Sequence, residues 1–236
     1  MIDVIFDHPD FVVINKPIGV SVHKDDQAIS FIQRLQQQLN EPQLYLVHRL
    51  DKITSGLLIL AKNTDANRQL SSAFQQRKVD KFYIALTDKR PRKKQGLITG
   101  DMIRSRRGTW KLVRTNNNPA ISQFFSYGCG GGLRLFLIKP YTGKTHQIRV
   151  ALKSLGSPII GDHLYYPNPD KNIDRSYLHA FALQFRYHDK LIQLHCMPTT
   201  GHLFSLDTIQ QQLVQLTKPW ILKWSKIKQN NKEAPS

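Results

Sequence analysis

Short apolar runs of strand length, separated by turns, recur along the chain and constrain its fold more than any other feature. They cover residues 4–6, 11–16, 44–47, 56–62, 81–87, 121–127, 133–139 and 191–195. Glycines fill the short segment between the runs at 121–127 and 133–139, as is typical of a β-hairpin. Hairpin connections favour an antiparallel sheet over alternating βαβ units. We therefore expect an α+β fold with a mixed, mainly antiparallel sheet flanked by helices and loops.

Helices are predicted at fewer places, where apolar residues recur at helical spacing. The expected helices cover residues 28–39, a segment beginning with Thr64 as N-cap, 145–155, 207–216 and 219–227. The sequence shows no internal repeat and no long linker. We therefore expect a single domain over residues 1–217, followed by a basic helix or tail over 218–236.

Positive charge is abundant and concentrated. The chain has 34 Lys and Arg against 17 Asp and Glu, a net charge of +17 with histidines neutral. Residues 77–114 hold 13 of these cations and three acids, a net +10. Such density indicates a partner with many phosphates, and binding of a nucleic acid there should weaken strongly with salt. The alternative is a solvated loop that serves solubility.

Several classes of protein are disfavoured by what the sequence lacks. The longest apolar stretch, residues 57–61, is far shorter than a membrane span, and the first residues lack the pattern of a signal peptide. Cys129 and Cys196 are too few for a disulfide framework, and the histidines lack the spacing of a metal site. We expect a cytoplasmic protein with no metal, no membrane partner and, by default, a monomeric state.

Residues 48–62 combine reactive side chains with a rigid position in the expected fold. An acid, bases and hydroxyls lie here between two apolar runs, and a loop between buried strands is where a scaffold presents reactive groups. Asp51 is therefore a candidate nucleophile or base. The alternative is that its carboxylate only caps the turn. Composition alone does not separate these two interpretations.

The segment HRLDKITSGLLILAK closely resembles the HRLDxxTSGLLLxAK signature of RluA-type pseudouridine synthases, and further segments match that family in order and spacing. These segments are residues 11–23, 81–85, 142–150, 156–162 and 178–185. Within them, Lys144 replaces the usual Arg and Ala151 replaces a His. The resemblance spans roughly residues 1–200 and implies the pseudouridine synthase fold, in a compact form without a preceding S4 domain.

The resemblance implies an enzyme that isomerises uridine in ribosomal or transfer RNA. The N1–C1′ bond breaks, the uracil turns and C5 bonds to C1′, so no cofactor is required. Asp51 would act as nucleophile at C1′ or as base at the sugar, with Arg149 keeping it ionised and Tyr83 taking the C5 proton. The residues implied in substrate binding are His48, Arg49, Thr54, Lys144, His146, Gln147 and Leu178. The target nucleotide should be flipped out of its stack.

Plainer interpretations of these residues stay open at this point. Arg149 shares a helical face with His146 and Lys153, as a surface arginine would, and Tyr83 and Leu178 are ordinary residues for a core. Rival functions are a catalytically silent RNA-binding or assembly factor, and a base-excision enzyme that releases uracil. A third idea treats residues 218–228 as a helix on a membrane surface.

Overall fold

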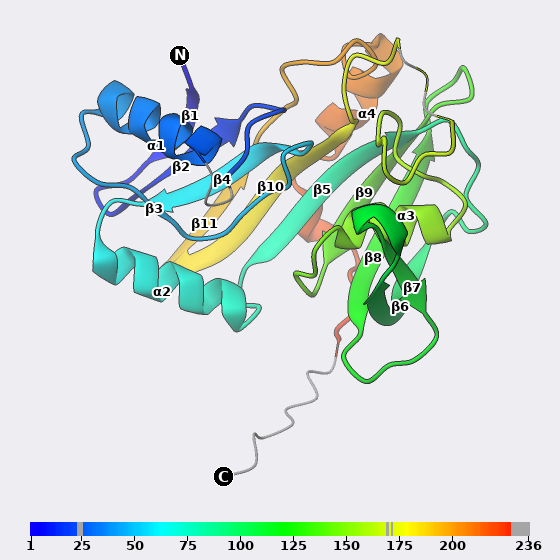
Figure 1. Cartoon of the computed structure of the whole chain (residues 1–236), viewed down its shortest axis with the longest axis horizontal. Coiled ribbons are helices and arrows are strands. Elements are labelled where there is room, and N and C mark those ends of the chain that lie inside the picture. The colour runs from blue at the N-terminus through cyan, green and yellow to red at the C-terminus, as the bar shows by residue number, and fades with distance from the viewer. Residues whose placement is uncertain (23–25, 169, 171, 228–236) are drawn as a thin grey trace.

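The computed structural model describes residues 1–22, 26–168, 170 and 172–227, and its centre is one eleven-stranded sheet (Figure 1). The strands are β1 (Asp3–Asp7), β2 (Phe11–Lys16), β3 (Tyr45–Leu46), β4 (Ser55–Ala61), β5 (Asp80–Thr87), β6 (Gln95–Arg104), β7 (Trp110–Val113), β8 (Ala120–Gly128), β9 (Arg134–Pro140), β10 (Leu178–Tyr187) and β11 (Lys190–His195). Their order is β1-β2-β4-β10-β5-β9-β8-β6-β7, with β3 paired to β4 and β11 to β10.

The pairing confirms a mixed, mainly antiparallel sheet. The one parallel pair among the described strands is β4 with β10, where His179 lies opposite Ser55 and Ala180 opposite Gly56. The pattern of apolar runs did not single out β10, because His179, Gln184 and Arg186 interrupt its apolar residues although most of the strand is buried. It nevertheless joins the two halves of the sheet.

Four α-helices flank the sheet among the described residues: α1 (Asp26–Leu39), α2 (Thr64–Gln75), α3 (Gln147–Ser154) and α4 (Asp207–Gln215). Helices α1 and α2 cover opposite faces of β2 and β4. Val12 and Leu58 pack in the cluster that contains Phe31 of α1, whereas Val13 and Leu57 pack in the cluster that contains Leu70 of α2. Burial on both faces explains why these two strands are continuously apolar.

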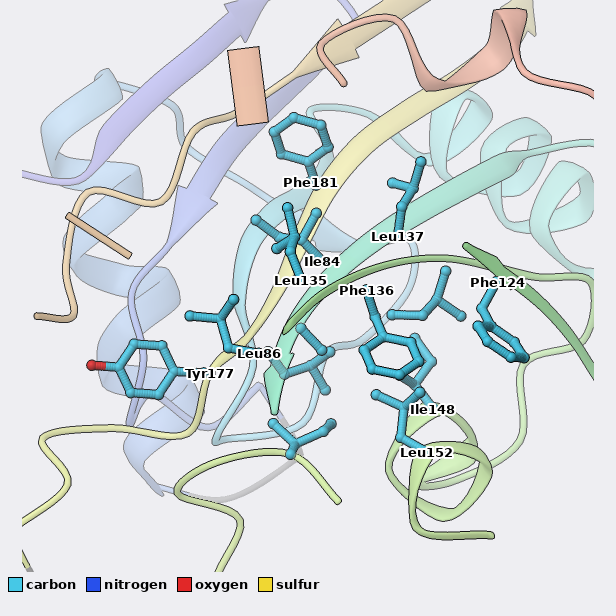
Figure 2. Close-up of a cluster of buried hydrophobic side chains, with 14 of the residues drawn as sticks. Ile84, Leu86, Phe124, Leu135, Phe136, Leu137, Ile148, Leu152, Tyr177 and Phe181 are labelled. Atoms are coloured by element: carbon cyan, nitrogen blue, oxygen red, sulfur yellow. The ribbon is translucent and has the colours of Figure 1, made fainter. Parts of the chain in front are cut away.

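Helix α2 begins one residue earlier than predicted from its cap. Asn63, not Thr64, is the N-cap, because its side-chain oxygen accepts the backbone N–H of Ala66 at 2.8 Å. Helix α3 packs on the other half of the sheet. In Figure 2 its residues Ile148 and Leu152 point toward Phe136 of β9, within the largest buried cluster. This packing fixes α3 beside the strands that carry the site.

The helix predicted over residues 219–227 is wrong. Only Pro219–Ile221 form a 3₁₀ turn, and the chain then continues without regular structure to Ile227. Trp224 packs instead on Phe82 and Phe125, at ring-centroid distances of 5.5 and 5.0 Å. The membrane-surface helix therefore does not form, and no helix in the described residues is long and apolar enough to span a bilayer. Residues 228–236 and the motif residue His23 lie outside the described part, and the boundary at residue 217 stays a prediction.

Candidate active site

Residues of α2, β5 and α3 line a pocket of about 500 Å³. This volume suits a small organic ligand such as a nucleoside. In the ribbon view, β5 runs between these two helices (Figure 1). All the predicted site residues line it: His48, Arg49, Asp51, Thr54, Tyr83, Lys144, His146, Gln147, Arg149 and Leu178. The fold thus brings together segments that lie up to 130 residues apart in the sequence (178 − 48 = 130).

Asp51 lies in the turn before β4 and is paired with Arg149 of α3. The Nη1 of Arg149 donates to Oδ2 of Asp51 at 3.3 Å, and 27% of the Asp51 side chain remains exposed. The backbone carbonyl of Asp51 accepts the N–H of Thr54 at 2.9 Å, which closes the turn. The carboxylate is therefore held by a cation while one side stays open to the pocket.

Arg149 is buried, not a surface arginine. It does share a side of α3 with Lys153, because both cations lie over the ring of Tyr165, at 4.9 and 5.5 Å. However, only 4% of Arg149 is exposed. The amphipathic pattern predicted the shared face correctly but could not show that Tyr165 and two carboxylates cover this part of it.

Asp162 is a site residue that the sequence reasoning did not assign. It is fully buried, and its carboxylate accepts hydrogen bonds from Nε and Nη2 of Arg149 at 2.7 and 2.8 Å. The remaining guanidinium nitrogen, Nη1, is left for Asp51. Burial lowers the pKa of Arg149, but the hydrogen bonds and charges of Asp162 and Asp51 outweigh it and raise that pKa above its ordinary value. The signal was available, because Asp162 ends the matched segment 156–162.

Tyr83 lies on β5, with Ala180 of β10 and Ile138 of β9 opposite it on either side. Burial, followed by the negative charge of Asp51, raises the pKa of Tyr83 above its usual value, so the phenol is protonated at neutral pH. Leu178, at the start of β10, is 3% exposed and also belongs to the core. Both residues therefore combine core packing with a place on the pocket wall.

His48 shapes the pocket from within the protein. Its Nε2 accepts the backbone N–H of Ile59 at 3.1 Å, and its ring stacks on Phe74 with centroids 4.3 Å apart. Burial, then the charge of Lys81, lowers the pKa of His48 to about 3, so the ring is neutral. Thr54 is buried beside Asp51, whereas Arg49 is exposed at the rim.

Gln147 is a positioning residue. Its Oε1 accepts from Thr142 Oγ1 and from the backbone N–H of Lys144, and its Nε2 donates to the Ile121 carbonyl and to Ser122 Oγ. These four bonds use the full capacity of an amide side chain. Gln147 was predicted to bind substrate; the structure leaves it no free hydrogen-bonding group for RNA and shows it fastening the loop that carries Lys144.

His146 lines the pocket, whereas Lys16 is buried outside its lining, close enough to Asp51 for the carboxylate charge to act on it. The Nδ1 of His146 lies 2.9 Å from the hydroxyl of Tyr165, which also accepts the backbone N–H of Trp110. Lys16 is fully buried and donates to the carbonyls of Pro17 and Val20, both at 2.9 Å. Burial lowers the pKa of Lys16 to about 7, against the opposing effect of Asp51.

Charge in the pocket is unbalanced. Asp51 is the sole acid among the described residues that line it, against five cations: Arg49, Arg77, Lys81, Lys144 and Arg149. In the part of the chain that the structure describes, no group of three or more His, Cys, Asp or Glu could hold a metal ion. The pocket thus suits an anionic ligand that presents one neutral group to a carboxylate.

Comparison with known proteins identifies the family. Residues 10–154 match the family profile described as RNA pseudouridylate synthase. A Haemophilus influenzae protein named as an uncharacterized RNA pseudouridine synthase is 51% identical over 223 residues, covering 94% of this chain and 99% of that protein. The chain belongs to the RNA pseudouridylate synthase family, and it is an isomerase of RNA uridine.

Two further relatives agree. The ribosomal large subunit pseudouridine synthase C of Rickettsia bellii is 35% identical over 167 residues, which cover 68% of this chain and 56% of that protein. The solved structure of human RNA Pseudouridylate Synthase Domain Containing 4 superposes with a TM-score of 0.73 at 26% identity, covering 88% of this chain and 93% of that one. The predicted family and fold class are confirmed.

Proposed function

We propose that this chain converts specific uridines of ribosomal or transfer RNA to pseudouridine, with Asp51 as the catalytic carboxylate and no cofactor. The observation that carries the proposal is the pair formed by Asp51 and Arg149 at 3.3 Å, inside a pocket that Tyr83 also lines. An ionised carboxylate is needed to attack C1′ or to take a proton from the sugar, and a cation in contact favours the ionised form.

Arg149 and Asp162 act together in this proposal. Because Asp162 engages two of the guanidinium nitrogens, the third is directed at Asp51 with little freedom to turn. Pre-organised charge of this kind costs no rearrangement during the reaction. Asp162 is therefore a positioning residue and Asp51 the group that meets the ribose.

Tyr83 has two roles in the proposed reaction. Its ring stacks on the flipped uracil, and Leu178 closes the other side of the base. Its hydroxyl relays the C5 proton in the last step: because the phenol is protonated, it passes its own proton on as it accepts the new one. The carboxylate of Asp51 is the acceptor in the same pocket, and N1 of the uracil takes up a proton in turn, so the carboxylate is regenerated and the reaction is a net isomerisation.

Ribosomal RNA of the large subunit is the first substrate to test. Proteins of Rickettsia bellii and Borreliella burgdorferi that share 35% and 33% identity with this chain are named ribosomal large subunit pseudouridine synthases C and D. Pseudouridine should be mapped in total RNA from cells with and without this protein, since the missing positions identify the target directly. Loss of positions in transfer RNA alone would redirect the proposal to that substrate.

Asp51→Asn tests the catalytic assignment. The amide keeps the size of the side chain but has no charge, so release of tritium from 5-tritiated uridine RNA should fall to background while RNA binding stays near wild type. Asp65→Asn is the matched control, because the Asp65 side chain is 88% exposed on α2 and outside the pocket. Normal tritium release by Asp51→Asn would refute the mechanism.

A further inference from the structure

The wall of the pocket formed by α2 and β5 carries two cations that the proposed chemistry does not use, Arg77 and Lys81. Lys81 is half-buried, and its ammonium group has no hydrogen bond or ion pair with any residue that the structure describes; its Nζ lies 5.7 Å from the ring of Phe74. The adjacent acid, Asp80, is engaged by Lys139 at 2.8 Å. A partly buried ammonium group without a counter-ion is costly, so it points to an anion that arrives with the ligand.

Arg77 occupies a backbone position that favours glycine. It follows the last turn of α2 with φ of 58°, in the left-handed region, and its N–H bonds to the carbonyl of Phe74. Glycine is the usual residue at such a helix end, because a Cβ is strained there. An arginine at this position is an unfavourable choice for the fold, and its side chain lines the pocket.

The same two cations also line a second, smaller hollow that adjoins the pocket. This hollow is bounded further by Asp80, Pro140, Tyr141 and Ile227, and it shares Arg77, Lys81 and Pro140 with the pocket. A polymer whose reacting unit occupies the pocket must leave it along the surface. The hollow marks one such path, with the two cations at the junction.

We propose that Lys81 and Arg77 form a phosphate-binding subsite, which takes the phosphodiester next to the uridine held over Asp51. The inference rests on the proposed function, because a uridine in the pocket carries a phosphate on each side of its ribose. Burial lowers the pKa of Lys81, against the opposing charge of Asp80, and a bound phosphate would offset this loss. The subsite positions the strand and does not read its sequence.

Binding of a short fluorescent oligouridylate, followed by anisotropy, tests the subsite. Lys81→Met keeps the length of the side chain and removes the charge, and Arg77→Gly removes the charge and relieves the backbone. At roughly 0.1 M KCl each variant should raise the Kd about tenfold. The slope of log Kd against log [KCl] should fall by about 0.7 for each variant and by about 1.4 for both together.

Two controls separate this subsite from general electrostatics and from damage to the fold. Lys78→Met removes an exposed cation of the same turn that lines neither hollow, so its Kd should change less than twofold, within about 0.4 kcal/mol. Thermal midpoints of Lys81→Met and Arg77→Gly should equal or exceed wild type, because each removes an unfavourable feature. A lowered midpoint would assign these residues a structural role and overturn the proposal.

The measurement is repeated in the Asp51→Asn background, where binding is read without turnover. Unchanged salt slopes in Lys81→Met and Arg77→Gly overturn the subsite, whatever the activity of the enzyme. Altered slopes support it even if Asp51→Asn proves active, in which case the catalytic assignment alone fails.

Discussion

Replacing Arg149 with lysine separates the charge of the site from its geometry. Arg149 reaches two carboxylates at once, through Nε and Nη2 to Asp162 and through Nη1 to Asp51. A lysine has one nitrogen and no planar fork, so it cannot serve both. We expect it to pair with Asp162, which is fully buried, and to abandon Asp51, whose side chain is 27% exposed.

The expected loss of rate follows from the distance between Arg149 and Asp51. Unit charges 3.3 Å apart interact by about 5 kcal/mol at an effective dielectric constant near 20. Because water reaches part of Asp51, we take about half of this, ~2–3 kcal/mol, as the lost stabilisation of the carboxylate. If that loss falls on the transition state, the single-turnover rate drops about 30- to 160-fold. The thermal midpoint should fall by about 4–10 °C, from the loss of one charged hydrogen bond to Asp162.

Tritium release from 5-tritiated uridine RNA at saturating enzyme measures the rate, and a thermal melt measures stability. Lys153→Ala is the control: its side chain is exposed on the same helix, so rate and midpoint should stay near wild type. Arg149→Ala should cost several orders of magnitude more activity than Lys153→Ala, and about 3–5 kcal/mol of stability, because the buried Asp162 then keeps backbone N–H partners but loses its cation. A wild-type rate in Arg149→Lys would refute the geometric argument.

Three further predictions concern stability. Gly56→Ala should cost about 3 kcal/mol or more in a urea titration, because its Cβ would lie 2.3 Å from the carbonyl oxygen of Ala180 at φ of +106°; Gly130→Ala, with open space around it, should cost about 1 kcal/mol. Trp224→Ala should lower the thermal midpoint by about 4–8 °C, and an unchanged midpoint would mean that residues 218–227 are not part of the core. Burial lowers the pKa of His179 to about 3, so the unfolded chain takes up a proton first as pH falls; the contribution of His179 to stability is full above about 6.5 and should decline by about 1.4 kcal/mol per pH unit toward 3, and His179→Asn should make the measured slope shallower by that amount.

Helices and strands were predicted correctly from the sequence where a single local rule determines them. The hairpin between β8 and β9 follows from its glycines, and α3 follows from the spacing of Ile148 and Leu152. The prediction failed at residues 219–227, where the apolar spacing of Trp220 and Trp224 suits a helix but also suits an extended segment packed on aromatic rings. Tertiary packing decides between such alternatives, and the local periodicity of a sequence carries no information about that packing.

The site residues were recognised through their motifs, but their partnership depends on non-local contacts. Asp162 lies 13 residues from Arg149 in sequence and 111 from Asp51, and only the fold shows that one guanidinium joins both acids. The restriction of Gln147 to protein partners was equally invisible, because the motif identifies the residue and not the number of bonds its amide forms.

The parallel pair of β4 and β10 explains why the motifs converge. Since His179 and Ser55 lie opposite each other and the two strands run the same way, the segments entering both strands meet at one edge of the sheet. These segments carry Leu178 and Asp51. The next strand beyond β10 is β5, which places Tyr83 opposite Ala180 in the same row. An antiparallel β10 would put Leu178 at the far end of β4, so this single crossover, which no local pattern specifies, assembles the pocket around Asp51.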